Sequence, residues 1–190
     1  MMSRQEVLAG YLEGCRHRRH HPGVSRGLLV GQAAPQPRPG SHCMPLFPYP
    51  VGCAGERLHR MSGWDLRDYF KWWDRVNTIA WFPGRAASGK GDAFPASVAR
   101  GQASQRMAEF HMSSRVCLFV GRANASAYPW AGGLPDAMEW QRQGGGGQWA
   151  WFPHTSGIVT FWNEARNREL LRGLFDEARQ IILSGEQIST

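Results

Sequence analysis

Residues 116–121 read VCLFVG, an uncharged run that ends in a glycine, and this run decides the fold class that the sequence predicts. Such a run is typical of a strand that is buried on both faces of a parallel sheet. Residues 95–110 before it are compatible with a helix, and residues 75–82 (RVNTIAWF) form another strand candidate. The order strand, helix, strand indicates a βαβ unit, so the sequence predicts an α/β fold.

Two more apolar runs extend this sheet to four short, mostly parallel strands: residues 27–31 (GLLVG) and 149–152 (WAWF). The other predicted helices cover residues 3–14, 53–61, 66–73 and 163–183. Asn163 is expected to cap the last helix, whose core face would hold Leu170, Leu171, Leu174, Ala178, Ile181 and Ile182. The aromatic and glycine-rich residues 122–147 are interpreted as an insertion within a single domain that spans 1–190.

The charge balance indicates a polyanionic partner. Lys and Arg number 22 against 15 Asp and Glu, which gives a net charge of +7. Lys and Arg side chains bind phosphates and release their counterions. The basic run RHRRHH at residues 16–21 has no acidic or cysteine ligand beside it, so it is interpreted as solvated surface or a phosphate contact rather than a metal site.

The same composition gives expectations about compartment and cofactors. No apolar run approaches the roughly 18 residues of a membrane span, and no signal peptide is readable, so we expect a soluble cytoplasmic protein. Cys15, Cys43, Cys53 and Cys117 contain no CxxC pair, which favours free thiols over a zinc or redox site. We therefore expect no metal and no cofactor.

Candidate site residues lie within or directly after three of the predicted strands. Gly31, Gln32 and Ala33 end the first strand, Asn77 lies in the second, and the last is followed by His154-Thr155-Ser156-Gly157. Open α/β folds bind ligands at the carboxyl edge of the sheet, where such strand ends meet. The sequence therefore predicts one site built from three separated loops.

These motifs, in this order, resemble those of the uracil-DNA glycosylase superfamily, over about residues 27–175. The first motif of that family is a strand ending in a Gly-Gln-Asp-Pro or Gly-Glu-Ala-Pro type of loop, and the last is His-Pro-Ser. The intervening PLFPYPVGCAGERL is similar to the segment that brings an aromatic ring to the base, with Gly52, Ala54 and Gly55 in the turn. The resemblance implies a three-layer α/β/α domain, near the nucleoid as a monomer, that flips a pyrimidine out of DNA and hydrolyses its glycosidic bond.

The resemblance also implies a role for each residue. His154 would donate to the base oxygen that gains negative charge, Asn77 would read the edge of the pyrimidine, and Gln32 would lie beside the attacking water. Gly31 and Ala33 would let backbone amides approach the sugar, and Phe47 or Tyr49 would stack on the base, although both rings are equally expected as core residues. Phosphate contacts are expected from Thr155, Ser156, Gly157, Ile158, Arg85 and Lys90.

Departures from the family pattern shape the expected substrate. Ala33 stands where many members carry an acidic or amide residue that activates water, which leaves Asp92 as the candidate for water activation. No bulky Tyr blocks the C5 side of the pyrimidine. We therefore expect uracil or a bulkier C5-modified pyrimidine, such as the hydroxymethylated or glucosylated bases of phage DNA, in repair or in anti-phage defence. The cysteine spacing predicts no iron-sulfur cluster.

Two other functions stay open at this point. The first is a nucleotide hydrolase of the P-loop type, because residues 84–90 (GRAASGK) have the spacing of a phosphate-binding P-loop, although Gly91 follows where Ser or Thr would hold magnesium. A DNA-binding module of the same fold without catalysis is the second alternative. The residue that would wedge into the duplex is not decided among Ile158, Phe161 and Trp162.

Overall fold

The computed structural model describes Glu6, Leu8 and residues 26–36, 44–89, 91–110, 114–130, 133–142, 147–156 and 159–186. The strands are β1 (Arg26–Ala33), β2 (Trp73–Ile79), β3 (Ser114–Val120), β4 (Gln141–Arg142) and β5 (Gln148–Phe152). The helices are α2 (Ala54–Ser62), α3 (Leu66–Trp72), α4 (Ala96–Phe110), α5 (Arg122–Ala125), the 3-10 helix η1 (Thr160–Asn163) and α6 (Ala165–Glu186). Glu6 and Leu8 are helical; most of the helix predicted at 3–14, and the basic run at 16–21, lie outside the described residues.

The strands form one sheet in the order β2-β1-β3-β5-β4. The first four run parallel, and β4 pairs antiparallel with β5 through Gln141 and Arg142. The α/β class is therefore confirmed, but the predicted count of four strands is wrong. The fifth strand lies inside the segment interpreted as an insertion, and a strand of two residues is too short to show an alternating pattern.

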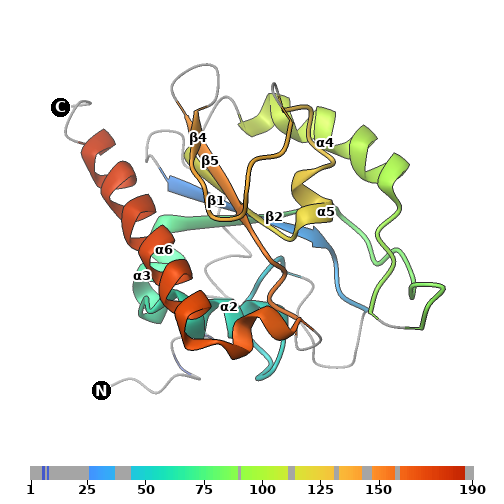
Figure 1. Ribbon diagram of the computed structural model, residues 1–190, viewed down its shortest axis with the longest axis horizontal. Coiled ribbons are helices and arrows are strands. Elements are labelled where there is room, and N and C mark those ends of the chain that lie inside the picture. The colour runs from blue at the N-terminus through green and yellow to red at the C-terminus, as the bar shows by residue number, and fades with distance from the viewer. Residues whose placement is uncertain are drawn as a thin grey trace.

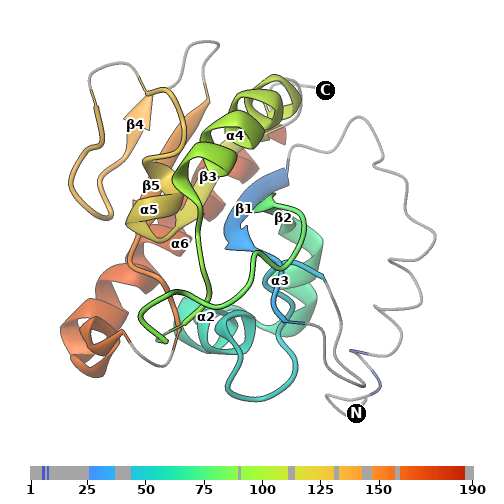
Figure 2. The ribbon, with the colours of Figure 1, turned by 90° about the vertical axis from the view of Figure 1, so that its right-hand side faces the viewer.

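Helices cover both faces of this sheet, as Figures 1 and 2 show from two sides. On one face α2, α3 and α6 pack against Leu29, Leu118 and Phe152. On the other face α4 and α5 pack against Leu28, Val30 and Phe119. Successive strand residues thus enter opposite cores, as the period of two in a strand requires. The arrangement is compatible with three α/β/α layers.

The C-terminal helix begins later than predicted. Asn163 ends η1 instead of capping α6, which starts at Ala165. Leu170 was expected in the core but is 50% exposed, whereas Leu171 and Leu174 are buried. At about 100° per residue, Leu170 lies roughly 100° around the helix from Leu171, at the edge of the stripe that faces the sheet.

Four tryptophans lie in the core of the protein. Trp72, Trp73, Trp149 and Trp151 are all at most 8% exposed. Cys53 and Cys117 are free thiols, and burial raises the pKa of Cys117 to about 12. Within the described ranges, no helix has the length and apolarity to cross a membrane.

Candidate functional site

The carboxyl ends of four parallel strands bring the predicted site residues to one edge of the sheet. In Figure 2 the arrowhead of β1 points toward α2 and the green segment that joins β2 to α4. Gly31 pairs with Asn77 across β1 and β2, and Val120 pairs with Phe152 just before the His154 loop. Ligands of open α/β sheets bind at this edge.

Gln32 and His154 meet at Gly121, the residue that follows β3. A Cβ atom placed on Gly121 would lie 2.8 Å from Nε2 of Gln32 and 3.5 Å from Cβ of His154. Gly121 also has a φ of +93°, which side chains other than glycine rarely adopt. A glycine here therefore lets a strand end and a loop that are far apart in sequence approach each other.

The hydrogen bond of His154 selects its protonation state. The backbone N–H of Ser156 donates to Nδ1 of His154 over 3.0 Å, so this nitrogen must carry a lone pair. Burial lowers the pKa of His154 below 6.5, and the negative charge of Asp92 offsets part of that effect. His154 is therefore a neutral imidazole near pH 7, with its proton on Nε2 as a hydrogen-bond donor.

Two contacts hold the His154 loop in place. The indole Nε1 of Trp162 donates to the carbonyl of His154 over 3.0 Å. The hydroxyl of Thr155 donates to the carbonyl of Ala54, the first residue of α2, over 2.9 Å. Thr155 and Trp162 are buried, at 0% and 2% exposure, so both side chains support the loop rather than face DNA. The predicted contacts at Gly157 and Ile158 lie outside the described residues.

Asn77 lies on the β2 side of the site, away from His154. Its side chain is packed against Gly31, where an added Cβ would overlap Oδ1 of the amide. Asn77 is only 6% exposed, yet its amide makes no hydrogen bond to any residue that the structure describes. It lines a cavity of about 190 Å³ together with Pro45, Arg75, Val76, Ala80 and Arg106.

This cavity does not include Gln32 or His154. The structure therefore brings two predicted residues together at Gly121 and places the third, Asn77, two strands away from β3 at the outer edge of the sheet. Ala33 pairs with Ile79 between these two places and packs on the core of the α4 face. Any slot shared by all three must lie across the ends of β1 and β3.

The two predicted stacking rings have different surroundings. Phe47 is 3% exposed, and its ring stacks on Phe70 with centroids 5.5 Å apart, as a core residue would. Tyr49 is 43% exposed and is thus the aromatic ring of this loop that a base can reach without rearrangement. Gly55 allows the loop that carries both rings to pack closely against α2, because a Cβ there would collide with the carbonyl of Phe47.

The segment with P-loop spacing forms a small hairpin. Arg85 and Asp92 pair across it, with an ion pair of 3.2 Å between exposed side chains. Its amides bond internally, from Ala86 to the carbonyl of Gly91 and from Gly89 to that of Ala86. The next helix starts only at Ala96, whereas a P-loop leads its free amides directly into a helix. Lys90 lies outside the described residues.

A buried polar network beneath the site was not predicted from the sequence. The hydroxyl of Thr78 donates to Oδ1 of Asn124 over 2.6 Å and lies 2.9 Å from the hydroxyl of Tyr128. Nδ2 of Asn124 donates to the carbonyl of Val30 over 2.8 Å. The network ties the ends of β1 and β2 to α5, and a lone Asn after a strand gives no sequence signal for it.

Comparison with models of protein families and with curated proteins finds no match. Within the described ranges, no group of three or more His, Cys, Asp or Glu side chains is placed to hold a metal ion.

Proposed function

We propose that this protein is a divergent member of the uracil-DNA glycosylase superfamily, which flips a pyrimidine nucleotide out of DNA and hydrolyses its glycosidic bond. The observation that carries the proposal is that Gln32 and a neutral His154 both approach Gly121 at the carboxyl edge of the sheet. An amide near an imidazole donor that Ser156 orients suits a reaction in which water attacks a sugar carbon and the base departs with the bonding electrons.

His154 stabilises the departing base. As the bond between C1′ and the pyrimidine nitrogen breaks, negative charge collects on the base and its O2 oxygen. The Nε2–H of neutral His154 donates to that oxygen, and the Ser156 amide keeps the ring in the required tautomer. A donor that is already oriented costs no reorganisation when the charge appears.

The attacking water would be positioned by Gln32. Gln32 can accept from and donate to a water molecule, but an amide cannot take a proton. Asp92 is the nearby carboxylate, since its charge acts on His154. Asp92 therefore remains our candidate to receive the proton of the attacking water, with Arg85 as its ion-pair partner.

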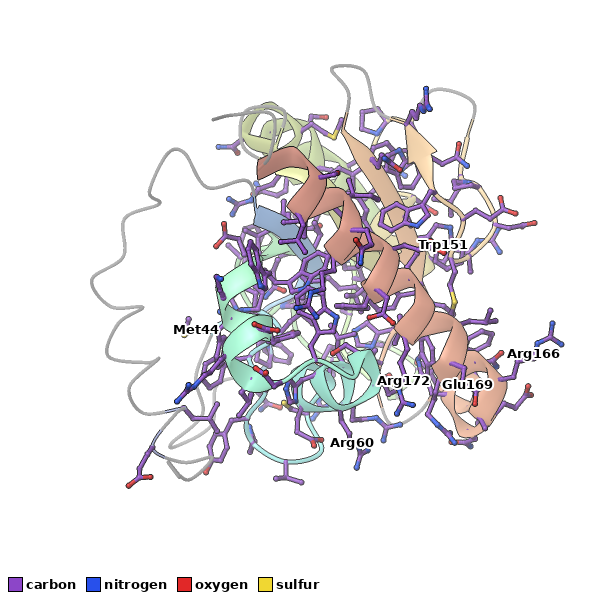
Figure 3. All side chains as sticks on the ribbon, turned by 90° about the vertical axis from the view of Figure 1, so that its left-hand side faces the viewer. Met44, Arg60, Trp151, Arg166, Glu169 and Arg172 are labelled. Atoms are coloured by element: carbon purple, nitrogen blue, oxygen red, sulfur yellow. The ribbon has the colours of Figure 1, made fainter. Side chains whose placement is uncertain are left out.

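Exposed arginines supply a surface for the DNA backbone. Arg166, in the first turn of α6, projects away from the molecule (Figure 3), and Arg60 of α2 and Arg172 of α6 are exposed as well. The first turn of α6 follows the His154 loop, so this surface adjoins the site. Of the two wedge candidates that the structure describes, Phe161 on η1 is 36% exposed and can reach a duplex without unfolding, whereas Trp162 is buried; Ile158 lies outside the described residues.

The test is a base-release assay on duplexes that carry uracil, 5-hydroxymethyluracil or a glucosylated pyrimidine at one position. Formation of abasic sites on at least one duplex supports the proposal. Binding of these duplexes without base release would instead make the protein a DNA-binding module of the same fold.

A further inference from the structure

Trp81 differs from every other tryptophan of the chain. It is 50% exposed, whereas the other eight of the nine tryptophans are buried or half-buried. Each of those eight makes a hydrogen bond, a ring contact or a cation–π contact. Trp81 makes none of these with the residues that the structure describes. A large apolar ring that the fold leaves on the surface is more typical of a binding surface than of a core.

The backbone on both sides of Trp81 is held in place. Two residues before it, the carbonyl of Ile79 accepts from the N–H of Ala34 over 3.2 Å, which joins the end of β2 to the end of β1. Three residues after it, the carbonyl of Gly84 accepts from the N–H of Ala93 over 2.9 Å. A ring that is carried by a fixed segment loses less conformational freedom when it binds a ligand.

The segment that carries Trp81 adjoins the candidate site. Trp81 follows β2, the neighbour of β1 in the sheet, and Gln32 lies near the end of β1. The hairpin after Trp81 contains Asp92, whose negative charge raises the pKa of His154. Neighbouring strands lie about 5 Å apart, so a nucleotide beside the flipped one can reach the end of β2.

The ligand that suits an exposed ring at this edge is an unpaired base. Aromatic side chains bind single-stranded nucleic acid by stacking on its bases, whatever the sequence, because every base has a flat face. In a closed duplex the neighbouring base pairs cover both faces of each base. The net charge of +7 favours the phosphates of the same strand.

We infer that Trp81 stacks on an unpaired base next to the flipped pyrimidine, so that the protein takes its target from single-stranded DNA in preference to closed duplex. This inference rests on the proposed function. It deepens that function by naming the form of the DNA, which the resemblance to a family of base-removing enzymes does not specify.

The experiment measures fluorescence anisotropy of a labelled single-stranded oligonucleotide and of its matching duplex, neither of which carries a uracil or a modified base. The wild type should bind the single strand more tightly. Trp81→Ala should weaken single-strand binding by about 10-fold and duplex binding by less than about 2-fold, because the stacked base loses its partner. Urea unfolding midpoints should stay at the wild-type value, since the ring makes no hydrogen bond or ring contact with the described residues.

Two further substitutions test whether the ring itself binds. Trp81→Phe keeps an aromatic face and should stay within about 3-fold of the wild type, whereas Trp81→Leu is apolar without a ring and should lose as much as Trp81→Ala. The matched control is Leu170→Ala, which removes an equally exposed apolar side chain from α6 and should leave single-strand binding unchanged.

Equal binding by Trp81→Phe and Trp81→Leu, or equal losses in Trp81→Ala and Leu170→Ala, would overturn the inference, because stacking would not explain them. Base release by the wild type without ring-dependent binding of the single strand would overturn it as well and leave the proposed function intact. Ring-dependent binding with no base released from any DNA would support the stacking role of Trp81 and contradict the glycosylase.

Discussion

The backbone N–H of Ser156 donates to Nδ1 of His154, two residues earlier in the same loop, over 3.0 Å. The bond requires a lone pair on Nδ1, so a neutral ring carries its proton on Nε2. Burial lowers the pKa of the ring and keeps it neutral. One short loop thus fixes both the charge and the donor atom of the residue that we place at the leaving base.

The pH dependence of base release follows from this protonation state. His154 acts as the neutral donor, so the single-turnover rate should stay level as the pH falls to 6.5, the ordinary value for histidine, and decline only below it. Rates over a pH series that runs from neutral into the acid range check this. A decline centred above 6.5 would contradict the lowered pKa.

Protein stability should change in the same pH range, with a definite sign. A pKa that is lower in the folded state means that the unfolded chain binds more protons at acid pH. His154 therefore lowers the free energy of unfolding as the pH falls through 6.5 toward the folded-state pKa. In His154→Gln, urea unfolding midpoints should fall less steeply over this window than in the wild type.

Removing the charge of Asp92 should lower the pKa of His154 further. The carboxylate of Asp92 raises this pKa against the larger effect of burial. In Asp92→Asn the NMR titration of the His154 ring should therefore move to lower pH, while Asp136→Asn, an exposed carboxylate in another loop, should leave it in place. If the pKa of His154 rose or stayed unchanged in Asp92→Asn, the result would contradict the placement of Asp92 near His154.

Gly31→Ala should reduce base release by displacing the amide of Asn77. The added Cβ would overlap Oδ1 of Asn77, so the amide must turn away from the base. We expect an overpacking cost of about 1–3 kcal/mol in urea unfolding and a loss of about 10-fold or more in rate. Gly101→Ala in α4 has open space around its Cβ and should instead add about 0.5–1 kcal/mol of stability.

Asn124→Ala should destabilise the ends of β1 and β2. It leaves the carbonyl of Val30 and the hydroxyl of Thr78 without their bonds to the amide. Buried polar groups left unsatisfied cost about 1–3 kcal/mol each, so urea unfolding should show a loss of about 2 kcal/mol or more. Tyr128→Phe removes one hydroxyl contact and should cost less than Asn124→Ala.

The sequence predicted the fold where burial is continuous and failed where structure depends on distant partners. β1, β3 and β5 are apolar runs that lie between helices, so their composition identified them. β4 exists only because Gln141 and Arg142 pair with β5, and Leu170 is exposed because it lies at the edge of the stripe of α6 that packs on the sheet. Neither relationship is encoded within a short window of sequence.

The sequence likewise predicted some features of the candidate site and missed others. The strand ends predicted that Gln32 and His154 would reach one edge, since parallel strands end together. The bond from Ser156 to His154, the influence of Asp92 on His154 and the cavity beside Asn77 depend on how loops and helices pack, and no residue spacing in the sequence predicts them.

The most direct test of the proposed glycosylase activity measures duplex binding and free base in the same sample, for the wild type and for His154→Ala. We predict that the wild type releases a pyrimidine base and leaves an abasic site. His154→Ala should bind the duplex within about 2-fold of the wild type but release the base about 100-fold more slowly, because the leaving base loses its donor. Equal release by both proteins, or no release of any tested pyrimidine by the wild type, would contradict it.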